Sequence, residues 1–232
     1  MKTRMRAAER QAAIVRSAIQ LFAEKGFRGA TTRELASALG VTEPVLYQHF
    51  RTKRDLYSAI IEAKARQATE RVDRLRPYAE SSDERAFFVR LAELILERYE
   101  TDPEITRLLL YSSLERHELS GLFFERVFAD FYQLVSDYIG RRIREGVFRE
   151  VDPEIAARGL IGMISYSGLV DLLFSGRLGK RSRKRTAREK VEIFLHGIAA
   201  PVGEECEEPT VPKSQNRRPR AGNLPDPLPP IR

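Results

Sequence analysis

The chain has 232 residues, 42% of them hydrophobic and 31% charged, a balance that excludes wholesale disorder and allows a sizeable buried core. Its single cysteine, Cys206, cannot form an internal disulfide, which fits a reducing, cytoplasmic location. The basic N-terminus has no apolar stretch after it, so we expect no secretory signal. The most apolar run, residues 159–174, is short and contains Asp171, which predicts a buried helix rather than a membrane span.

The formal net charge of +7 is concentrated near the N-terminus. Residues 1–57 carry eleven Lys and Arg against five Asp and Glu, whereas residues 201–232 carry five of each. Such a local surplus is typical of a segment that binds a polyanion. A second basic segment, residues 177–190, holds eight Lys and Arg against Glu189 alone, and we interpret it as a solvated connection.

Four helices are predicted in the first third of the chain, over about residues 7–25, 31–39, 42–50 and 52–75. Gly26 and Gly40 end the first two. Thr31 with Glu34 three positions later has the pattern of a capping box, and Pro44 lies in the first turn of the third helix, where a missing N–H costs little.

Longer helices are predicted beyond Pro77, over about residues 82–100, from 102 onward, and over 118–145, 152–175 and 186–200. The sequence Asp-Pro-Glu occurs at 102–104 and again at 152–154, and it is a typical helix start. We find no alternation of period two that would predict strands. Eight of the twelve prolines lie in the last 32 residues, which predicts a disordered tail at 201–232.

Residues 31–57 combine two short helices joined by a glycine-containing turn. This is the pattern of a DNA-binding helix-turn-helix, whose second helix enters the major groove. In that helix Tyr47 and His49 offer hydrogen-bond donors to phosphate, and Gln48 can reach a base edge. The alternative is a helical hairpin with a solvated basic face.

Three further residues, Thr31, Thr32 and Lys53, are predicted at helix N-termini, where backbone N–H groups favour a phosphate. The stretch from Ile14 to Ile60 resembles the N-terminal domain of the TetR (tetracycline-repressor-like) family, above all in the segment GVTEPVLYQHFRTKRDL. The resemblance implies a homodimeric, all-helical repressor. In it the larger domain binds a small ligand and the last two helices pair between subunits.

The resemblance also implies roles for single residues. It implies that phosphates are contacted by Thr32, Tyr47, His49 and Lys53. It implies that bases are faced by Arg33, Glu43, Pro44, Val45 and Gln48. Together with Thr31 and Thr42, these are the expected DNA-binding residues. Glu43 and Pro44 stand where the family often has small or hydroxylated residues, so the operator sequence does not carry over.

Aromatic residues gather at helical spacing between Phe123 and Tyr132. Core packing explains each of them singly, but a ligand-binding repressor also needs an apolar cavity, and this stripe can line one. Tyr111, His117 and Tyr166 can supply polar groups that orient a ligand. The expected pocket residues are Tyr111, His117, Phe124, Phe128 and Tyr166.

Small residues along 156–168 and an apolar stripe on the last helix indicate self-association. Two such helices from each subunit can form a four-helix interface. The expected interface residues are Gly159, Gly162, Ser165, Val191, Phe194, Leu195 and Ile198. The alternative is that both stripes pack only within the subunit.

We therefore expect an all-α protein of about nine helices. Residues 1–57 would form a three-helix DNA-binding domain, residues 58–200 a larger effector-binding and dimerisation domain, and residues 201–232 a tail. The expected function is that of a ligand-responsive regulator, a repressor that binds a near-palindromic operator as a dimer and is released by a small, largely apolar effector. Its partners would be double-stranded DNA, that effector and a second copy of the chain, without a membrane.

Catalytic motifs are absent from the sequence: it has no nucleophile elbow, HExxH, paired-cysteine motif or phosphate-binding loop. The three histidines, His49, His117 and His196, share no ligand spacing. We expect no enzymatic activity, metal or cofactor. Two alternatives remain, a non-specific or architectural nucleic-acid binder and a helical enzyme with an unrecognised site.

Overall fold

Helices build the part of the chain that the computed structural model describes, residues 7–114, 119–174 and 182–199. These residues form ten α-helices and one isolated antiparallel bridge, between Phe148 and Ala199. The predicted all-α fold is confirmed. The predicted tail at 201–232 lies outside the described residues.

Three helices form the N-terminal head: α1 (Ala7–Gly29), α2 (Thr32–Ala38) and α3 (Glu43–His49). Gly26, the predicted end of the first helix, breaks α1 with φ of 73°, and one more turn follows. The predicted capping box is present: the Thr31 hydroxyl accepts from the Glu34 N–H, and the Glu34 carboxylate accepts from the Thr31 N–H at 2.9 Å. Gly40, between α2 and α3, also has positive φ, 64°.

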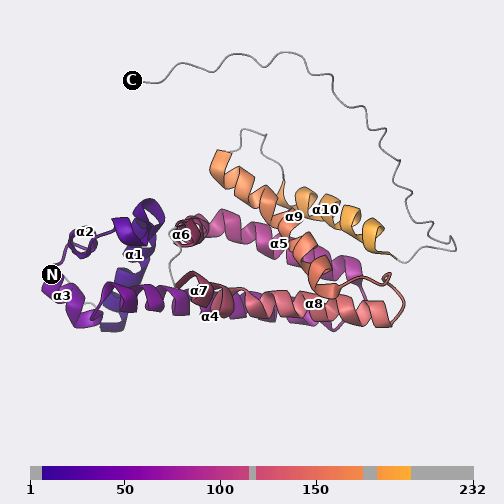
Figure 1. Cartoon of the computed structure of the whole chain (residues 1–232), viewed down its shortest axis with the longest axis horizontal. Helices are drawn as coiled ribbons and strands as arrows, with labels where there is room; N and C mark the ends of the chain where they lie inside the picture. The colour runs from indigo at the N-terminus through magenta and orange to yellow at the C-terminus, as the bar shows by residue number, and fades with distance from the viewer. Residues whose placement is uncertain (1–6, 115–118, 175–181, 200–232) are drawn as a thin grey trace, which may run out of the picture. The chain divides into compact units, whose positions relative to one another are not determined.

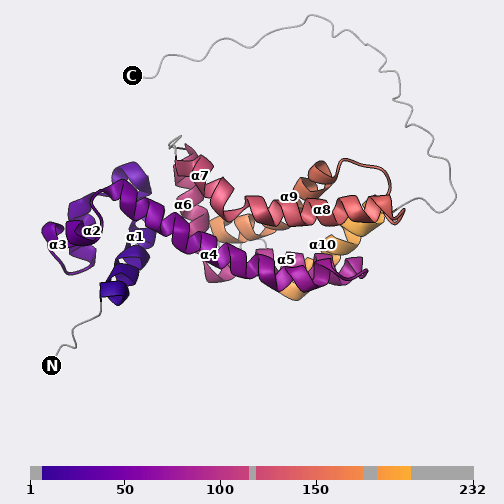
Figure 2. The ribbon, with the colours of Figure 1, turned by 90° about the horizontal axis from the view of Figure 1, so that it is seen from below.

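The next helix, α4 (Lys53–Ala79), leaves the head and runs along the rest of the described fold (Figures 1 and 2). At 1.5 Å per residue its 27 residues span about 40 Å. After it come α5 (Glu84–Thr101) and α6 (Pro103–Leu114). In both views α2 and α3 lie at one end, and α8, α9 and α10 lie towards the other.

The chain continues with α7 (Leu119–Val127), α8 (Ala129–Arg144), α9 (Pro153–Phe174) and α10 (Arg183–Ile198). The described residues thus hold ten helices instead of the predicted nine, because the helix predicted at 118–145 is interrupted at Phe128, whose φ is −116°. No glycine or proline marks this break. It occurs where α7 and α8 turn to different cores: Phe123 packs among the head residues, and Val135 packs in the second cluster.

Buried side chains form two clusters. The first joins the head to α4, α6 and α7, and it includes Phe22, Tyr57 and Leu108. The second joins α5, α8, α9 and α10 to the far end of α4, at Leu75. The boundary predicted after residue 57 falls inside the continuous helix α4, so the domain ranges 1–57 and 58–200 stay a prediction.

The predicted buried helix, α9, is buried along one face only, through Ala157, Leu160, Ile161, Ile164 and Gly168. By length and composition alone, with a mean hydropathy of 1.3 over 18 residues, α9 could span a membrane. In this fold 28% of that window is buried. In this fold α9 packs against α5, α8 and α10. On its other face Ile155, Tyr166 and Leu173 are exposed.

Candidate nucleic-acid interface and candidate ligand cavity

One face of α3 anchors the helix and the opposite face is open. Leu46 and Phe50 are buried in the first cluster. The open side of the helix-turn-helix carries polar and aromatic groups. Its exposed residues are Arg33, Thr42, Pro44, Tyr47 and Gln48. Val45 and His49 are half-buried beside them. An exposed face on a well-anchored short helix is what entry into a major groove requires.

Side-chain hydrogen bonds tie α2 to α3. The Thr32 hydroxyl donates to the Glu43 carboxylate at 3.0 Å, and the Tyr47 hydroxyl lies 3.5 Å from the Thr32 oxygen. Glu43 is half-buried, and its hydrogen bond from Thr32 fixes the relative position of the two helices.

Two cations flank the head. The Lys53 ammonium lies 4.4 Å from the centre of the Phe27 ring, so the first turn of α4 is fastened to α1. Lys25 forms an ion pair of 2.6 Å with Glu34. That hydrogen bond, followed by those from Thr31, lowers the pKa of Glu34 from 4.5 to about 2. The capping box of α2 therefore keeps its charged form at neutral pH.

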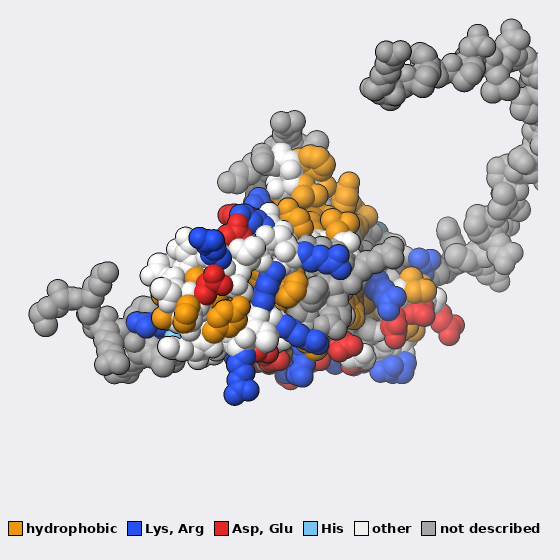
Figure 3. Space-filling model, turned by 60° about the vertical axis from the view of Figure 1, so that its left-hand side comes forward, with side chains coloured by type: hydrophobic (Ala, Val, Ile, Leu, Met, Phe, Trp, Pro, Cys, Tyr) orange, Lys and Arg blue, Asp and Glu red, His pale blue; other side chains and the backbone are white. Residues whose placement is uncertain are grey.

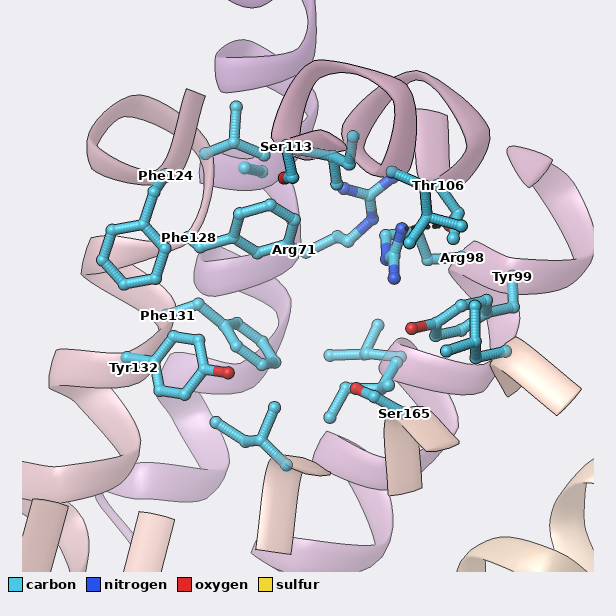
Figure 4. A pocket seen from close by; sticks show the side chains of 18 residues that line it. Arg71, Arg98, Tyr99, Thr106, Ser113, Phe124, Phe128, Phe131, Tyr132 and Ser165 are labelled. Atoms are coloured by element: carbon cyan, nitrogen blue, oxygen red, sulfur yellow. Dashed lines mark hydrogen bonds between the residues drawn. The ribbon is translucent and has the colours of Figure 1, made fainter. Parts of the chain in front are cut away.

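A cavity of about 360 Å³ lies among α4, α5, α6, α7, α8 and α9 (Figure 4). Phe124, Phe128, Phe131 and Tyr132 form one wall and Tyr99 stands opposite. Eleven of its eighteen lining residues are aliphatic or phenylalanine. A concave, mostly apolar site with a few polar groups is typical of small-molecule binding. Of the five expected pocket residues, Phe124 and Phe128 line this cavity.

Two other expected pocket residues, Tyr111 and Tyr166, do not line this cavity. The Tyr111 hydroxyl donates to the Glu24 carbonyl oxygen at 3.2 Å, which holds this side chain against α1. Tyr166 is 67% exposed on the outer face of α9. His117 lies outside the described residues. The polar groups of this cavity come instead from Arg71, Arg98, Tyr99, Thr106, Ser113, Tyr132 and Ser165.

Sequence reasoning missed the two arginines because charged residues are usually solvated. A signal was available, however. Arg98 follows Leu91, Leu94 and Ile95 at helical spacing on the apolar face of α5. Arg71 similarly stands between Ala68 and Leu75 on the buried face of α4. A cation on an apolar helix face indicates either a buried partner or a ligand.

Residues expected at a subunit interface divide into three groups. Val191 and Ile198 are buried inside their own subunit, and Phe194 and Leu195 pack partly against the same core. Ser165 lines the cavity. Only Gly159 and Gly162 are exposed, and a Cβ added at either would meet no atom within 4 Å. The stripe on the last helix thus packs wholly or partly inside the subunit, and the interface residues stay a prediction.

The sixth helix connects the cavity to the head. Thr106, Leu109 and Ser113 line the cavity, while Leu108 is buried among head residues. Next to Ser113, the hydroxyl of Ser112 shares a buried hydrogen bond with Tyr57 of α4. Tyr57 in turn packs its ring 5.3 Å from that of Phe27 in the head. One helix therefore forms part of both regions.

Metal-binding chemistry finds no support in the described ranges: they contain no group of three or more His, Cys, Asp or Glu residues that could hold an ion.

Two family models match the chain. Residues 14–60 match the model described as "Bacterial regulatory proteins, tetR family". Residues 86–197 match "AefR-like transcriptional repressor, C-terminal domain". The two matches together cover more than half of the chain, and they fall on the head with the start of α4 and on the helices from α5 to α10.

Individual proteins agree with these matches. The nucleoid occlusion factor SlmA of Vibrio atlanticus is 30% identical over 149 residues, 62% of this chain and 73% of SlmA. The class C tetracycline repressor protein of Escherichia coli is 49% identical over 51 residues, 22% of this chain and 23% of the repressor. The crystal structure of AibR with isovaleryl coenzyme A and operator DNA has a TM-score of 0.65 at 20% identity, covering 80% of this chain and 97% of that one.

The matches to both the head and the helices behind it, together with a helix-turn-helix that leaves one face of α3 open, lead to one conclusion. This chain belongs to the TetR family of transcriptional regulators.

Proposed function

We propose that the chain is a ligand-responsive repressor that binds a near-palindromic operator as a homodimer and is released by a small, largely apolar effector. The observation that carries this proposal is the double role of α6. Its residues line the cavity on one side and pack into the head on the other. A ligand that displaces α6 would therefore move the surface that contacts DNA.

For the DNA contacts, the open face of α3 supports the roles implied by the family resemblance. Gln48 and Arg33 are exposed and would reach base edges. Tyr47 and His49 would donate to phosphates, together with Thr32 and Lys53. Because Glu43 is hydrogen-bonded to Thr32, we assign it to positioning the two helices rather than to base contact.

For the dimer, the outer face of α9 supports a revised interface. Ile155, Gly159, Gly162 and Tyr166 follow one another at helical spacing along it, and Ile155 is 69% exposed. Ile193 of α10 is also two-thirds exposed. Figure 3 shows hydrophobic side chains gathered at the upper edge of the surface. An apolar face with glycines allows a partner helix to approach closely.

The effector would release the DNA because it binds one conformation of the protein more tightly than the other. An effector shifts DNA binding only by as much as it prefers the conformation that fits DNA poorly. The AibR structure is a complex with both isovaleryl coenzyme A and operator DNA, which supports the view that this fold can bind both kinds of partner. Because the proposed target is genomic DNA, a cytoplasmic location is part of the same proposal.

A selection from random duplexes with the purified full chain tests the proposal. We expect an enriched near-palindrome whose half-sites are about one helical turn or a multiple apart. The selected duplex should bind at least about a thousandfold more tightly than a scrambled one at the same salt concentration. An affinity ratio near one would support the architectural binder instead.

Sedimentation tests the dimer separately. The full chain should sediment as a dimer at micromolar concentration, and Tyr166→Glu should convert it to a monomer because a carboxylate would be buried unpaired in the interface. Val191→Thr serves as a contrast, since it alters the stripe that packs inside the subunit. A monomeric unaltered chain would contradict the dimer.

A further inference from the structure

Two guanidinium groups lie next to each other at the wall of the cavity (Figure 4). Arg71 comes from α4 and Arg98 from α5, and both line the cavity. Arg98 donates to the Thr106 hydroxyl at 3.0 Å and lies 4.2 Å from the centre of the Tyr99 ring. Arg71 forms no hydrogen bond in the part of the chain that the structure describes. Arg98 is therefore held in place, while the donors of Arg71 remain available.

The nearest carboxylates are already paired with other cations. Asp102 accepts from Lys64 at 2.6 Å, in an ion pair whose two side chains are nearly buried. Glu97 accepts from Arg74 at 3.0 Å. Neither Arg71 nor Arg98 forms an ion pair with any described residue, and none of the eighteen lining residues carries a carboxylate. Asp102 and Glu97 act on Arg71 through space, but neither lines the cavity, so the two positive charges have no carboxylate facing them inside it.

Placing two like charges side by side, away from bulk water, is unfavourable. The pKa of Arg71 is lowered, first by burial and then by the charge of Arg98, and the charges of Asp102 and Glu97 offset this only in part. Guanidinium groups remain charged at neutral pH, so the repulsion is not relieved by loss of a proton. An anion bound between the two groups would relieve it.

Resting on the proposed function, we infer that the effector has an apolar body and one anionic oxygen group, a carboxylate or a phosphate, which binds to Arg71 and Arg98. Guanidinium groups match either anion with two parallel hydrogen bonds. Thr106 orients Arg98 for this contact. The apolar body would lie against Phe124, Phe128 and Phe131 on the facing wall.

The aromatic wall could also attract a cation such as a quaternary ammonium group. Two arginines in the same cavity argue against it, because a cationic head would be repelled by both. The charge of the ligand head is therefore the property that distinguishes these possibilities, and a series of probes with the same ten-carbon body isolates it.

Calorimetric titration of the full chain, without DNA, tests the inference below the micelle-forming concentration of each probe. The probes are decanoate, decyl phosphate, decan-1-ol and decyltrimethylammonium. We expect decanoate or decyl phosphate to bind at least about tenfold more tightly than decan-1-ol, as charged hydrogen bonds imply. The comparison of the two acids identifies the preferred anion. Equal binding of decan-1-ol, or tighter binding of the ammonium probe, would overturn the inference.

Arginine variants locate the contact. Arg71→Gln should weaken binding of the preferred acid by about ten- to a hundredfold and leave decan-1-ol within about threefold. Arg74→Gln is the matched control, because it lies one turn further along α4 and is ion-paired outside the cavity. An unchanged acid affinity in Arg71→Gln and Arg98→Gln would overturn the assignment. Should either variant fail to fold, the probe series on the unaltered chain still decides.

These outcomes are separate from those of the proposed function. If an acid binds through the arginines but leaves operator affinity unchanged, the cavity inference stands and release by this effector fails. If decan-1-ol releases DNA as well as the acids do, the regulator proposal stands and the anionic head is rejected.

Discussion

The head and the cavity are built in opposite ways. The expected DNA-binding residues all fall within 31–53, and their geometry depends on two short helices and one turn. The cavity takes its lining from six helices between Ala68 and Leu169. The head exposes polar groups on a buried base, whereas the cavity borders an apolar space with two half-buried cations. A local surface is specified by its own segment, whereas a cavity between several helices is specified by how distant segments pack.

The strongest test of their connection is Leu108→Ala. Leu108 is fully buried in the cluster that joins α6 to the head, so the substitution should lower the free energy of unfolding by about 2–5 kcal/mol. Because α6 belongs to both regions, operator affinity and ligand affinity should both fall. Thermal and denaturant unfolding measure the first effect. Leu114→Ala, at a position 81% exposed on the same helix, is the control. Loss of only one of the two affinities would show that the regions are independent.

A second pair of variants acts on the head alone. Gln48→Ala should reduce discrimination between matched and scrambled operators by about 1–3 kcal/mol, because a base contact is lost. Lys53→Ala should weaken all duplexes alike and reduce the salt slope of binding by about one unit. Mobility-shift titrations at several salt concentrations separate the two. Ligand affinity should be unchanged in both, and circular dichroism should verify that Lys53→Ala keeps its helices without the Phe27 contact.

A third variant acts on the cavity alone. A Cβ added at Gly168 would lie 2.4 Å from the Tyr99 ring, so Gly168→Ala must displace that side chain near its base. Such overpacking typically costs about 1–3 kcal/mol. Since Tyr99 lines the cavity and stacks on Arg98, ligand binding should also weaken. Gly121→Ala, where the added Cβ meets no atom within 4 Å, is the control. Equal ligand affinity in both variants would contradict this role of Tyr99.

The smallest expected effect is on the pKa of one side chain, Glu34. The pKa of Glu34 is about 2, held down chiefly by its hydrogen bond from Lys25 and then by Thr31. A lowered carboxylate pKa means that its contribution to stability is complete above about pH 4.5 and is lost as the pH falls towards 2. Lys25→Gln should raise the Glu34 pKa, measured by NMR, towards its ordinary value. An unchanged pKa in that variant would show that Thr31 alone is responsible.

The sequence alone determined the helical architecture, most helix starts and the position of the helix-turn-helix. These features depend on contacts between residues close in the chain. The Thr31–Glu34 capping box and the Asp-Pro-Glu starts involve neighbours within one turn, and the positive-φ glycines at 26 and 40 act on their own backbone. The same locality explains why Tyr47 and Gln48, singled out from the sequence as groups that contact DNA, are exposed on α3.

Tertiary structure decided the rest. The break at Phe128 depends on α7 and α8 packing into different clusters, and no glycine or proline at this position predicts it. Tyr166 was expected inside the cavity and lies on the outer face of α9, while Arg98 was passed over and lies at the cavity wall. Helical periodicity states which residues share a face. Only the packing of one helix against another determines which face meets a neighbour, which encloses a space and which is left for solvent or a partner.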